Sequence, residues 1–285
     1  MTSRRNFDRR FIKATGNTPV EYLSEQKIEE NIERFSFLHE IISETGDKLT
    51  SSLIKFFNWF GFDNVNDFDK TNTNSLALEE DIQVKLPKGL LIIECKGIGG
   101  TSTDADCSQI SKIKHRRCKE RKNFDVFALY IVNHQRYLPP LNRKNPPFTN
   151  HQIEDAKNDE RGLLTTWQLF QLYFDIEAGV ITKEEAREMI LEYGLIEFTP
   201  KGLSLLYEPN EIFSDGHVCI VNLDNVSLKV DDDLFIEKNG RFKKVRIISM
   251  QENGIVVNEA STGEVGLKVS SKIEKKSKIW KKIKI

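Results

Sequence analysis

The residues whose types and spacing point most directly to chemistry are Asp81, Glu94 and Lys96. They lie in residues 80–97, where apolar residues first alternate and then, after a turn at Pro87, form an unbroken apolar run. This pattern predicts a β-hairpin whose second strand is buried on both faces. Folding about the turn places Asp81 opposite Glu94, and strand alternation places Lys96 on the face of Glu94. Two carboxylates and one ammonium group are therefore expected to meet.

Such a set of groups suits metal-assisted chemistry on phosphates. Two carboxylates and a backbone carbonyl, here that of Cys95, are ligands for a hard cation such as Mg²⁺ or Mn²⁺. A neighbouring ammonium group can orient a water molecule or neutralise charge that develops on a phosphate. The alternative is a surface hairpin with solvated charges, although surface charges rarely end a continuous apolar strand.

The order Asp, then Glu-x-Lys, resembles the motif of the PD-(D/E)xK nucleases, the restriction-endonuclease-like superfamily. Glu80 stands where that family usually has proline. The resemblance implies an α/β fold, a restriction-endonuclease-like mixed sheet flanked by helices, and a Mg²⁺- or Mn²⁺-dependent endonuclease acting on phosphodiester bonds, with DNA favoured over RNA. It also implies a glutamine on the following helix. The implied catalytic set is Asp81, Glu94, Lys96 and Gln109, with Asp81, Glu94 and the Cys95 backbone carbonyl as metal ligands.

Helices are expected on both sides of the hairpin. A helical pattern covers residues 49–60, and the polar residues 63–75 are typical of a loop. A second helix is expected to begin near Ala105 and to carry a basic cluster. Within this cluster Lys112, Arg116 and Arg117 are candidate phosphate contacts, and a solvated helix face is the alternative.

A buried strand is predicted over residues 126–132, followed by Asn133, His134 and, further on, Arg143. Polar loops at strand ends commonly hold ligand-binding residues in α/β folds, so these three are candidates for substrate contact. For His134, a structural role is the alternative to that of general base. This segment resembles defence-associated bacterial nuclease-like proteins, which implies anti-phage defence, DNA restriction or DNA repair as the setting.

The pattern changes towards the C-terminus. Residues 161–174 are expected to form an amphipathic helix with its aromatic side chains in the core, and Thr182 with Glu185 to cap a further helix. Short strands then follow, without intervening helices, and predict a small closed β-barrel. Their expected ranges are 217–222, 234–237, 243–250, 254–259, 265–269 and 279–283. The segment resembles the second domain of elongation-factor-Tu-type proteins, which implies contact with RNA, with a partner protein or with a second copy of the chain.

Residues 3–35 resemble the end of an AraC-type helix-turn-helix regulator. The resemblance implies a groove-facing recognition helix, and the alternative is a helical cap packed on the next domain. The expected domains are an N-terminal helical segment (1–35), a nuclease-like domain (36–194), a linker (195–216) and the barrel (217–285).

Composition limits the classes of function. The 285 residues have a net charge of −1, so any nucleic-acid contact must come from local basic patches. The four cysteines have no C-x-x-C spacing, which favours neither a zinc site nor disulfides and predicts a cytoplasmic protein. No apolar run predicts a membrane span. The alternative to the nuclease is a non-catalytic nucleic-acid-binding regulator or adaptor built on the same fold.

Overall fold

The computed structural model describes residues 35–71, 79–207 and 212–283. The chain divides into two compact units, Met1–Trp167 and Gln168–Ile285. The AraC-like stretch lies almost wholly outside the described residues, so its role stays a prediction. No helix among the described residues has both the length and the apolar character needed to cross a membrane.

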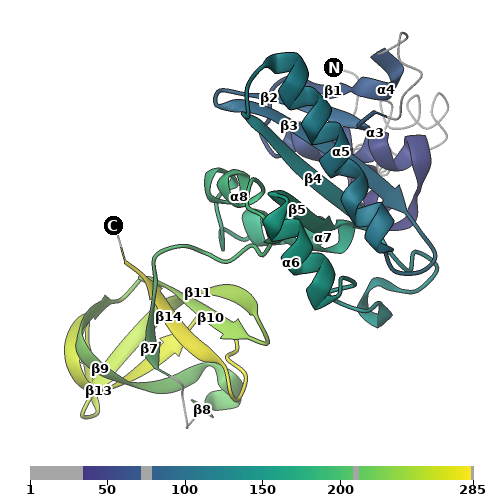
Figure 1. Ribbon diagram of the computed structural model, residues 1–285. Helices are drawn as coiled ribbons and strands as arrows, with labels where there is room; N and C mark the ends of the chain where they lie inside the picture. The colour runs from purple at the N-terminus through teal and green to yellow at the C-terminus, as the bar shows by residue number, and fades with distance from the viewer. Residues whose placement is uncertain (1–34, 72–78, 208–211, 284–285) are drawn as a thin grey trace, which may run out of the picture. The chain divides into compact units, whose positions relative to one another are not determined.

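The first unit contains a mixed sheet in which the strands lie in sequence order (Figure 1). The β1/β2 and β2/β3 pairs are antiparallel, whereas β3/β4 and β4/β5 are parallel. Its strands are β1 (Val65–Asp67), β2 (Ile82–Leu86), β3 (Gly89–Gly97), β4 (Val126–Asn133) and β5 (Arg161–Thr165). Its helices are residues 35–43, α3 (Gly46–Trp59), α4 (Phe68–Thr71), α5 (Asp104–Arg121), the short η1 (Pro140–Asn142) and α6 (Asn150–Asn158).

Helices cover both faces of this sheet. In Figure 1, α5 and α6 lie in front of the strands and α3 lies behind them. The central strand β3 is buried from Leu90 to Glu94, which confirms the prediction of a strand covered on both sides. Consecutive β3 side chains therefore face α5 and α3 in turn. This alternation determines which of the two helices each polar residue at the end of β3 faces.

Gly89, at the turn between β2 and β3, is required by its surroundings. Its φ is +149°, and a Cβ atom there would lie 2.0 Å from the backbone oxygen of Asp125, which accepts a hydrogen bond from Leu90. We expect Gly89→Ala to lower the free energy of unfolding by about 1–3 kcal/mol. Gly100→Ala is the matched control, because nothing lies within 4 Å of its added Cβ atom. Denaturant unfolding of the two variants measures the difference, and equal losses would contradict this explanation.

Three local predictions were wrong. Residues 161–165 form strand β5, and the helix begins only with α7 (Thr166–Glu177). All five residues of β5 are buried, Arg161 and Thr165 included, and so short a buried segment has no period that separates strand from helix. Phe174, expected in the core, is 51% exposed. The stretch expected to be a loop contains β1 and α4, since pairing with β2 outweighs its polar composition.

The second unit contains a larger antiparallel sheet with the order β7-β14-β10-β11-β13-β9-β8, and β12 pairs with β11. Its described strands follow an open path, so the closed barrel expected from the sequence is not found among them. The predicted linker contains strands β7 and β8, which pair with β14 and β9. The bounds are α8 (Lys183–Met189), β6 (Gly194–Leu195), β7 (Leu203–Tyr207), β8 (Ile212–Phe213), η2 (Ser214–Gly216), β9 (Val218–Lys229), β10 (Asp233–Lys238), β11 (Arg241–Glu252), β12 (Ile255–Val257), β13 (Glu259–Val269) and β14 (Lys278–Lys282).

The second unit, Gln168–Ile285, includes most of α7 and all of α8. Within it, Asp175 on α7 pairs with Arg241 at 3.0 Å, and Glu185 on α8 pairs with Lys282 at 2.6 Å. The capping box of Thr182 and Glu185 is confirmed. These contacts hold α7 and α8 against the strands of the same unit. The boundary between the two compact units therefore does not lie at residue 194.

Candidate active site

The hairpin register brings Asp81 and Glu94 together. Ile82 pairs with Ile93, so the same register continued by one residue places Asp81 opposite Glu94. One oxygen of Asp81, Oδ2, accepts a hydrogen bond of 2.7 Å from the backbone N–H of Cys95. Glu94 is only 6% exposed although it is an acid. Asp81 and Glu94 therefore lie at the same end of the hairpin, and their joint binding of a cation stays a prediction.

Helix α5 supplies the other side of the site. Gln109 donates a hydrogen bond of 2.9 Å from Nε2 to Glu94 Oε1, and its own Oε1 accepts one of 2.8 Å from Lys96 Nζ. The amide thus links the carboxylate to the ammonium group and fixes the orientation of both. Of the four residues predicted to be catalytic, Glu94, Gln109 and Lys96 are linked by these hydrogen bonds, whereas Asp81 bonds the backbone N–H of Cys95, the residue between Glu94 and Lys96.

Asp106 is a member of this cluster that the sequence analysis missed. Its Oδ1 accepts a hydrogen bond of 3.0 Å from Lys96 Nζ, while Oδ2 accepts from the backbone and hydroxyl of Thr103. Burial acts to raise the pKa of Asp106, but the hydrogen bonds from Thr103 and Lys96 outweigh it and hold the pKa below its ordinary value. The signal that would have identified it is the Thr103-x-x-Asp106 capping box at the start of α5.

Cys95 faces the opposite helix, as strand alternation predicts. Its Sγ lies 3.4 Å from the hydroxyl of Thr50 on α3. Burial, and next the charge of Asp81, raise the pKa of the thiol well above its ordinary value. At neutral pH this side chain is therefore a neutral part of the α3 layer, and only its backbone faces the carboxylates.

The segment that carries Asp81, directly before β2, is held by a buried ion pair. Glu80 is fully buried, and the guanidinium of Arg117 reaches both of its oxygens, at 2.8 and 2.9 Å. Arg117 also pairs with Glu79 at 2.6 Å and lies over the ring of Phe68 at 4.6 Å. Burial acts to lower the pKa of the guanidinium, but its hydrogen bonds to Glu80 and Glu120 raise it. Arg117, predicted to contact nucleic acid, is instead engaged inside the protein.

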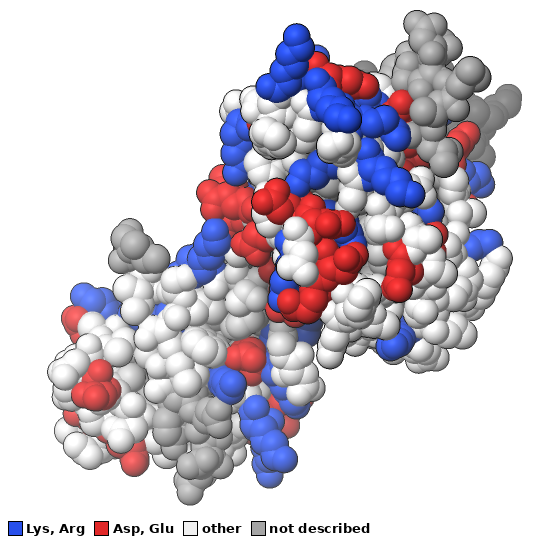
Figure 2. Space-filling view, in the orientation of Figure 1, with Lys and Arg blue, Asp and Glu red and all other residues white. Residues whose placement is uncertain are grey.

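The other two predicted phosphate contacts on α5, Lys112 and Arg116, differ in their surroundings. Lys112 is exposed on α5, and it lines a cavity of about 240 Å³ together with Gln109 and Arg116. Arg116 also pairs with Glu79 at 3.4 Å. Figure 2 shows Lys and Arg side chains gathered over α5 and the β2–β3 hairpin, whereas Asp and Glu gather over α6. A phosphate contact therefore remains a prediction for Lys112 and Arg116.

Asn133, His134 and Arg143 form an internal network rather than an open substrate surface. Arg143 is 6% exposed and donates to Asn133 Oδ1 and to the backbone oxygen of Ile42, both at 2.8 Å. His134 is 1% exposed, and its Nε2 lies 2.8 Å from the backbone oxygen of Lys144. Burial lowers the pKa of His134 and keeps it neutral. These positions give the three residues a role in holding the loop after β4.

The chemistry of the donors fits a hard divalent cation. Within residues 35–71, 79–207 and 212–283, no three or more His, Cys, Asp or Glu side chains gather to hold a metal ion. The site offers instead the carboxylates of Asp81 and Glu94 with the adjacent backbone carbonyl of Cys95. Oxygen donors with only two protein carboxylates are typical of Mg²⁺, which keeps several water ligands. The residues therefore fit Mg²⁺ or Mn²⁺ better than zinc.

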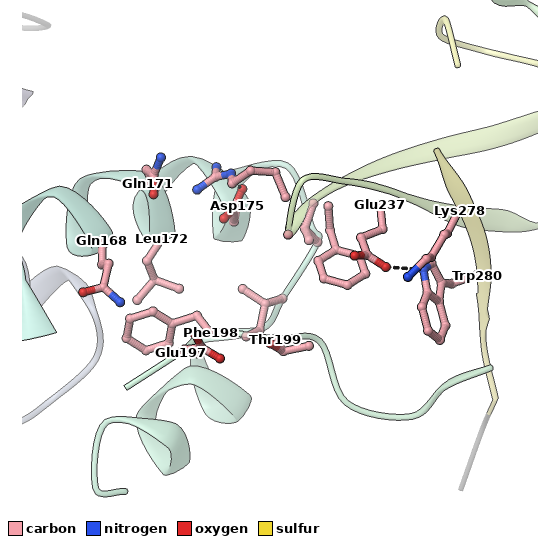
Figure 3. A pocket seen from close by; sticks show the side chains of 15 residues that line it. Gln168, Gln171, Leu172, Asp175, Glu197, Phe198, Thr199, Glu237, Lys278 and Trp280 are labelled. Atoms are coloured by element: carbon pink, nitrogen blue, oxygen red, sulfur yellow. Dashed lines mark hydrogen bonds and ion pairs between the residues drawn. The ribbon is translucent and has the colours of Figure 1, made fainter. Parts of the chain in front are cut away.

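A separate cavity of about 530 Å³ lies in the second unit (Figure 3). Gln171 and Asp175 of α7 line it together with Trp280 of β14, whose indole Nε1 donates to Glu237 at 3.0 Å. Burial raises the pKa of Asp175, and the charge of Arg241 opposes this. The cavity shares no residue with the cluster around Asp81, and we assign it no part in that chemistry.

No family model matches the chain, and no curated protein matches it. Among solved structures, the chain is similar to restriction endonuclease FokI at 13% identity, covering 70% of this chain and 35% of that one with a TM-score of 0.38. It is also similar to the small subunit of a heterodimeric restriction endonuclease, at 13% identity, covering 55% of this chain and 86% of that one with a TM-score of 0.37. Translation elongation factor SelB from Methanococcus maripaludis is similar at 11% identity, covering 84% of this chain and 56% of that one with a TM-score of 0.24.

Proposed function

We propose that this protein is a metal-dependent nuclease that hydrolyses phosphodiester bonds, with DNA as the favoured substrate, on a restriction-endonuclease-like fold. The observation that carries the proposal is the hydrogen-bonded group of Glu94, Gln109 and Lys96 at the end of buried strand β3, with Asp81 bonded to the backbone of the same strand at Cys95. An antiparallel hairpin that continues into parallel strands supports the proposed fold class. Two acids and a base so placed are difficult to explain as surface residues, since Glu94 is buried.

Each residue has a distinct role in this proposal. Asp81 and Glu94, with the Cys95 carbonyl, would hold Mg²⁺ or Mn²⁺, which when bound polarises a phosphate oxygen and lowers the pKa of water. Lys96 orients the attacking water and stabilises charge on the phosphate. Gln109 is a positioning residue, because its amide holds both Glu94 and Lys96.

The direct test is incubation of the purified protein with plasmid DNA and with structured RNA in Mg²⁺, in Mn²⁺ and in chelator. We expect cleavage of DNA that requires a divalent cation. Binding of either nucleic acid without cleavage under all three conditions would contradict the proposal and favour the non-catalytic regulator.

Replacing Lys96 separates cation binding from turnover. We expect Lys96→Met to lower the cleavage rate by about 10²-fold or more while cation affinity changes little, because the ammonium group acts on water and phosphate. Calorimetric titration with Mn²⁺ and single-turnover cleavage measure the two quantities. Lys114→Met is a suitable control, since that lysine of α5 pairs with Glu160 at 3.2 Å instead. A loss of cation binding in the Lys96 variant would show that this lysine organises the ligands instead.

A further inference from the structure

The loop that follows β4, residues 134–149, presents large apolar side chains to solvent. Tyr137 is 74% exposed and Leu141 is 84% exposed. The guanidinium of Arg136 lies over the Tyr137 ring at 4.2 Å and bonds its hydroxyl. An exposed aromatic ring with an arginine beside it is the usual means by which proteins bind bases without reading their sequence.

The ring is held in a defined position. Backbone bonds join Arg136 to Ile98 and Gln135 to Gly100, at 3.2 and 2.9 Å. The buried side chain of Arg143 also donates to the backbone oxygen of Leu138 at 3.0 Å. The Tyr137 ring also packs so closely on Gly99 that a Cβ atom there would lie 3.0 Å from it. A ring fixed in this way loses little conformational freedom when a ligand binds.

The charge of this surface favours a polyanion over an acidic or neutral protein surface. Residues 134–149 contain Arg136, Arg143 and Lys144 and no aspartate or glutamate, and residues 97–103 contain no acid either. Lys144 is exposed, whereas Arg143 is buried. The apolar ring therefore lies within a surface segment that attracts phosphates.

The ring also lies close to the candidate active site. Gly99, which contacts Tyr137, follows Lys96 by three residues, so their Cα atoms are at most about 11 Å apart. That distance corresponds to about three steps along one nucleic-acid strand, at 3.4 Å each. A base on Tyr137 and a phosphate at Lys96 can thus belong to the same strand.

We propose that Tyr137 is a stacking platform for an unpaired nucleobase, so that the substrate is single-stranded nucleic acid or a duplex with an unpaired stretch beside the cleaved bond. Bases inside a duplex stack on their neighbours and expose no ring face to a side chain, so only an unpaired base fits. This inference rests on the proposed function, because it names the substrate class of the same site.

The test measures binding in chelator, where no cleavage is needed. Fluorescence anisotropy compares a labelled oligothymidine of about 15 nucleotides with a duplex of equal length. We expect the single strand to bind more tightly than the duplex. Tyr137→Ala should weaken single-strand binding by about 5- to 150-fold, and Tyr137→Phe should retain it.

Phe124→Ala is the matched control, because Phe124 is 93% exposed and precedes β4, so it lies at the opposite end of that strand from Tyr137. It should leave single-strand binding unchanged. The inference is overturned if Tyr137→Ala binds the single strand as wild type does, or if Phe124→Ala loses as much. It is also overturned if Tyr137→Ala alters only self-association in sedimentation, which would make the loop a protein contact. Tyr137-dependent binding without any cation-dependent cleavage would refute the nuclease and leave the platform standing.

Discussion

Glu94→Gln should abolish cleavage, with a loss of at least about 10³-fold, while leaving the metal-free protein as stable as wild type or more so. Removing one of two carboxylates removes a cation ligand, and metal ions contribute several kcal/mol to transition-state stabilisation. Stability is kept because glutamine retains the oxygen that accepts from Gln109, and because it removes a buried charge opposite Asp81. Cleavage in Mg²⁺ and thermal unfolding in chelator measure the two effects.

The control for Glu94→Gln is Glu154→Gln on α6, an acid that is 66% exposed and pairs with Lys157 one helical turn away. It should alter neither cleavage nor unfolding, because exposed pairs of this kind contribute little. A Glu94→Gln protein that unfolds earlier in chelator yet still cleaves would show that Glu94 holds the sheet together and binds no cation.

The sequence predicted the parts of the site that follow from strand geometry. The register of Asp81 with Glu94 and the shared face of Glu94 with Lys96 need only a turn position and the alternation of side chains. The partners of long charged side chains were not predictable in this way. Arg117 and Lys112 lie five residues apart on α5, yet one is buried against Glu80 and the other is exposed. Which of them faces the sheet depends on tertiary packing.

The same limit explains the errors in secondary structure. Residues 161–165 are too short to show the period of either a strand or a helix, and pairing of β5 with β4 decides between them. In the second unit, turns such as Asn239-Gly240 and Asn253-Gly254, with positive φ at every residue, mark the strand ends well. These turns do not determine whether the outer strands of the sheet pair with each other, so closure of a β-barrel could not be predicted from them.

Arg117→Met should lower the free energy of unfolding by about 3–5 kcal/mol, because it leaves the carboxylate of Glu80 in the interior without its bidentate partner. Glu80 is fully buried, and beyond Arg117 the side chain that bonds it is Gln83, at 2.6 Å. Since Asp81 follows directly, cleavage should fall as well. Denaturant unfolding measures the loss, and Glu80→Gln combined with Arg117→Met should recover about 1–3 kcal/mol of it, because the double variant buries no unpaired charge.

Arg121→Met is the comparison for Arg117→Met, because Arg121 is also an arginine of helix α5. Arg121 pairs with Asp125 at 2.5 Å, but its side chain is 38% exposed, against 8% for Arg117. Water already solvates much of this outer pair, so its loss should cost less than about 1 kcal/mol. Similar losses for the two arginines would mean that α5 depends on its positive charge in general. A large difference, recovered in the double variant, would identify the Glu80–Arg117 pair as the contact that fixes the chain directly before Asp81 and β2.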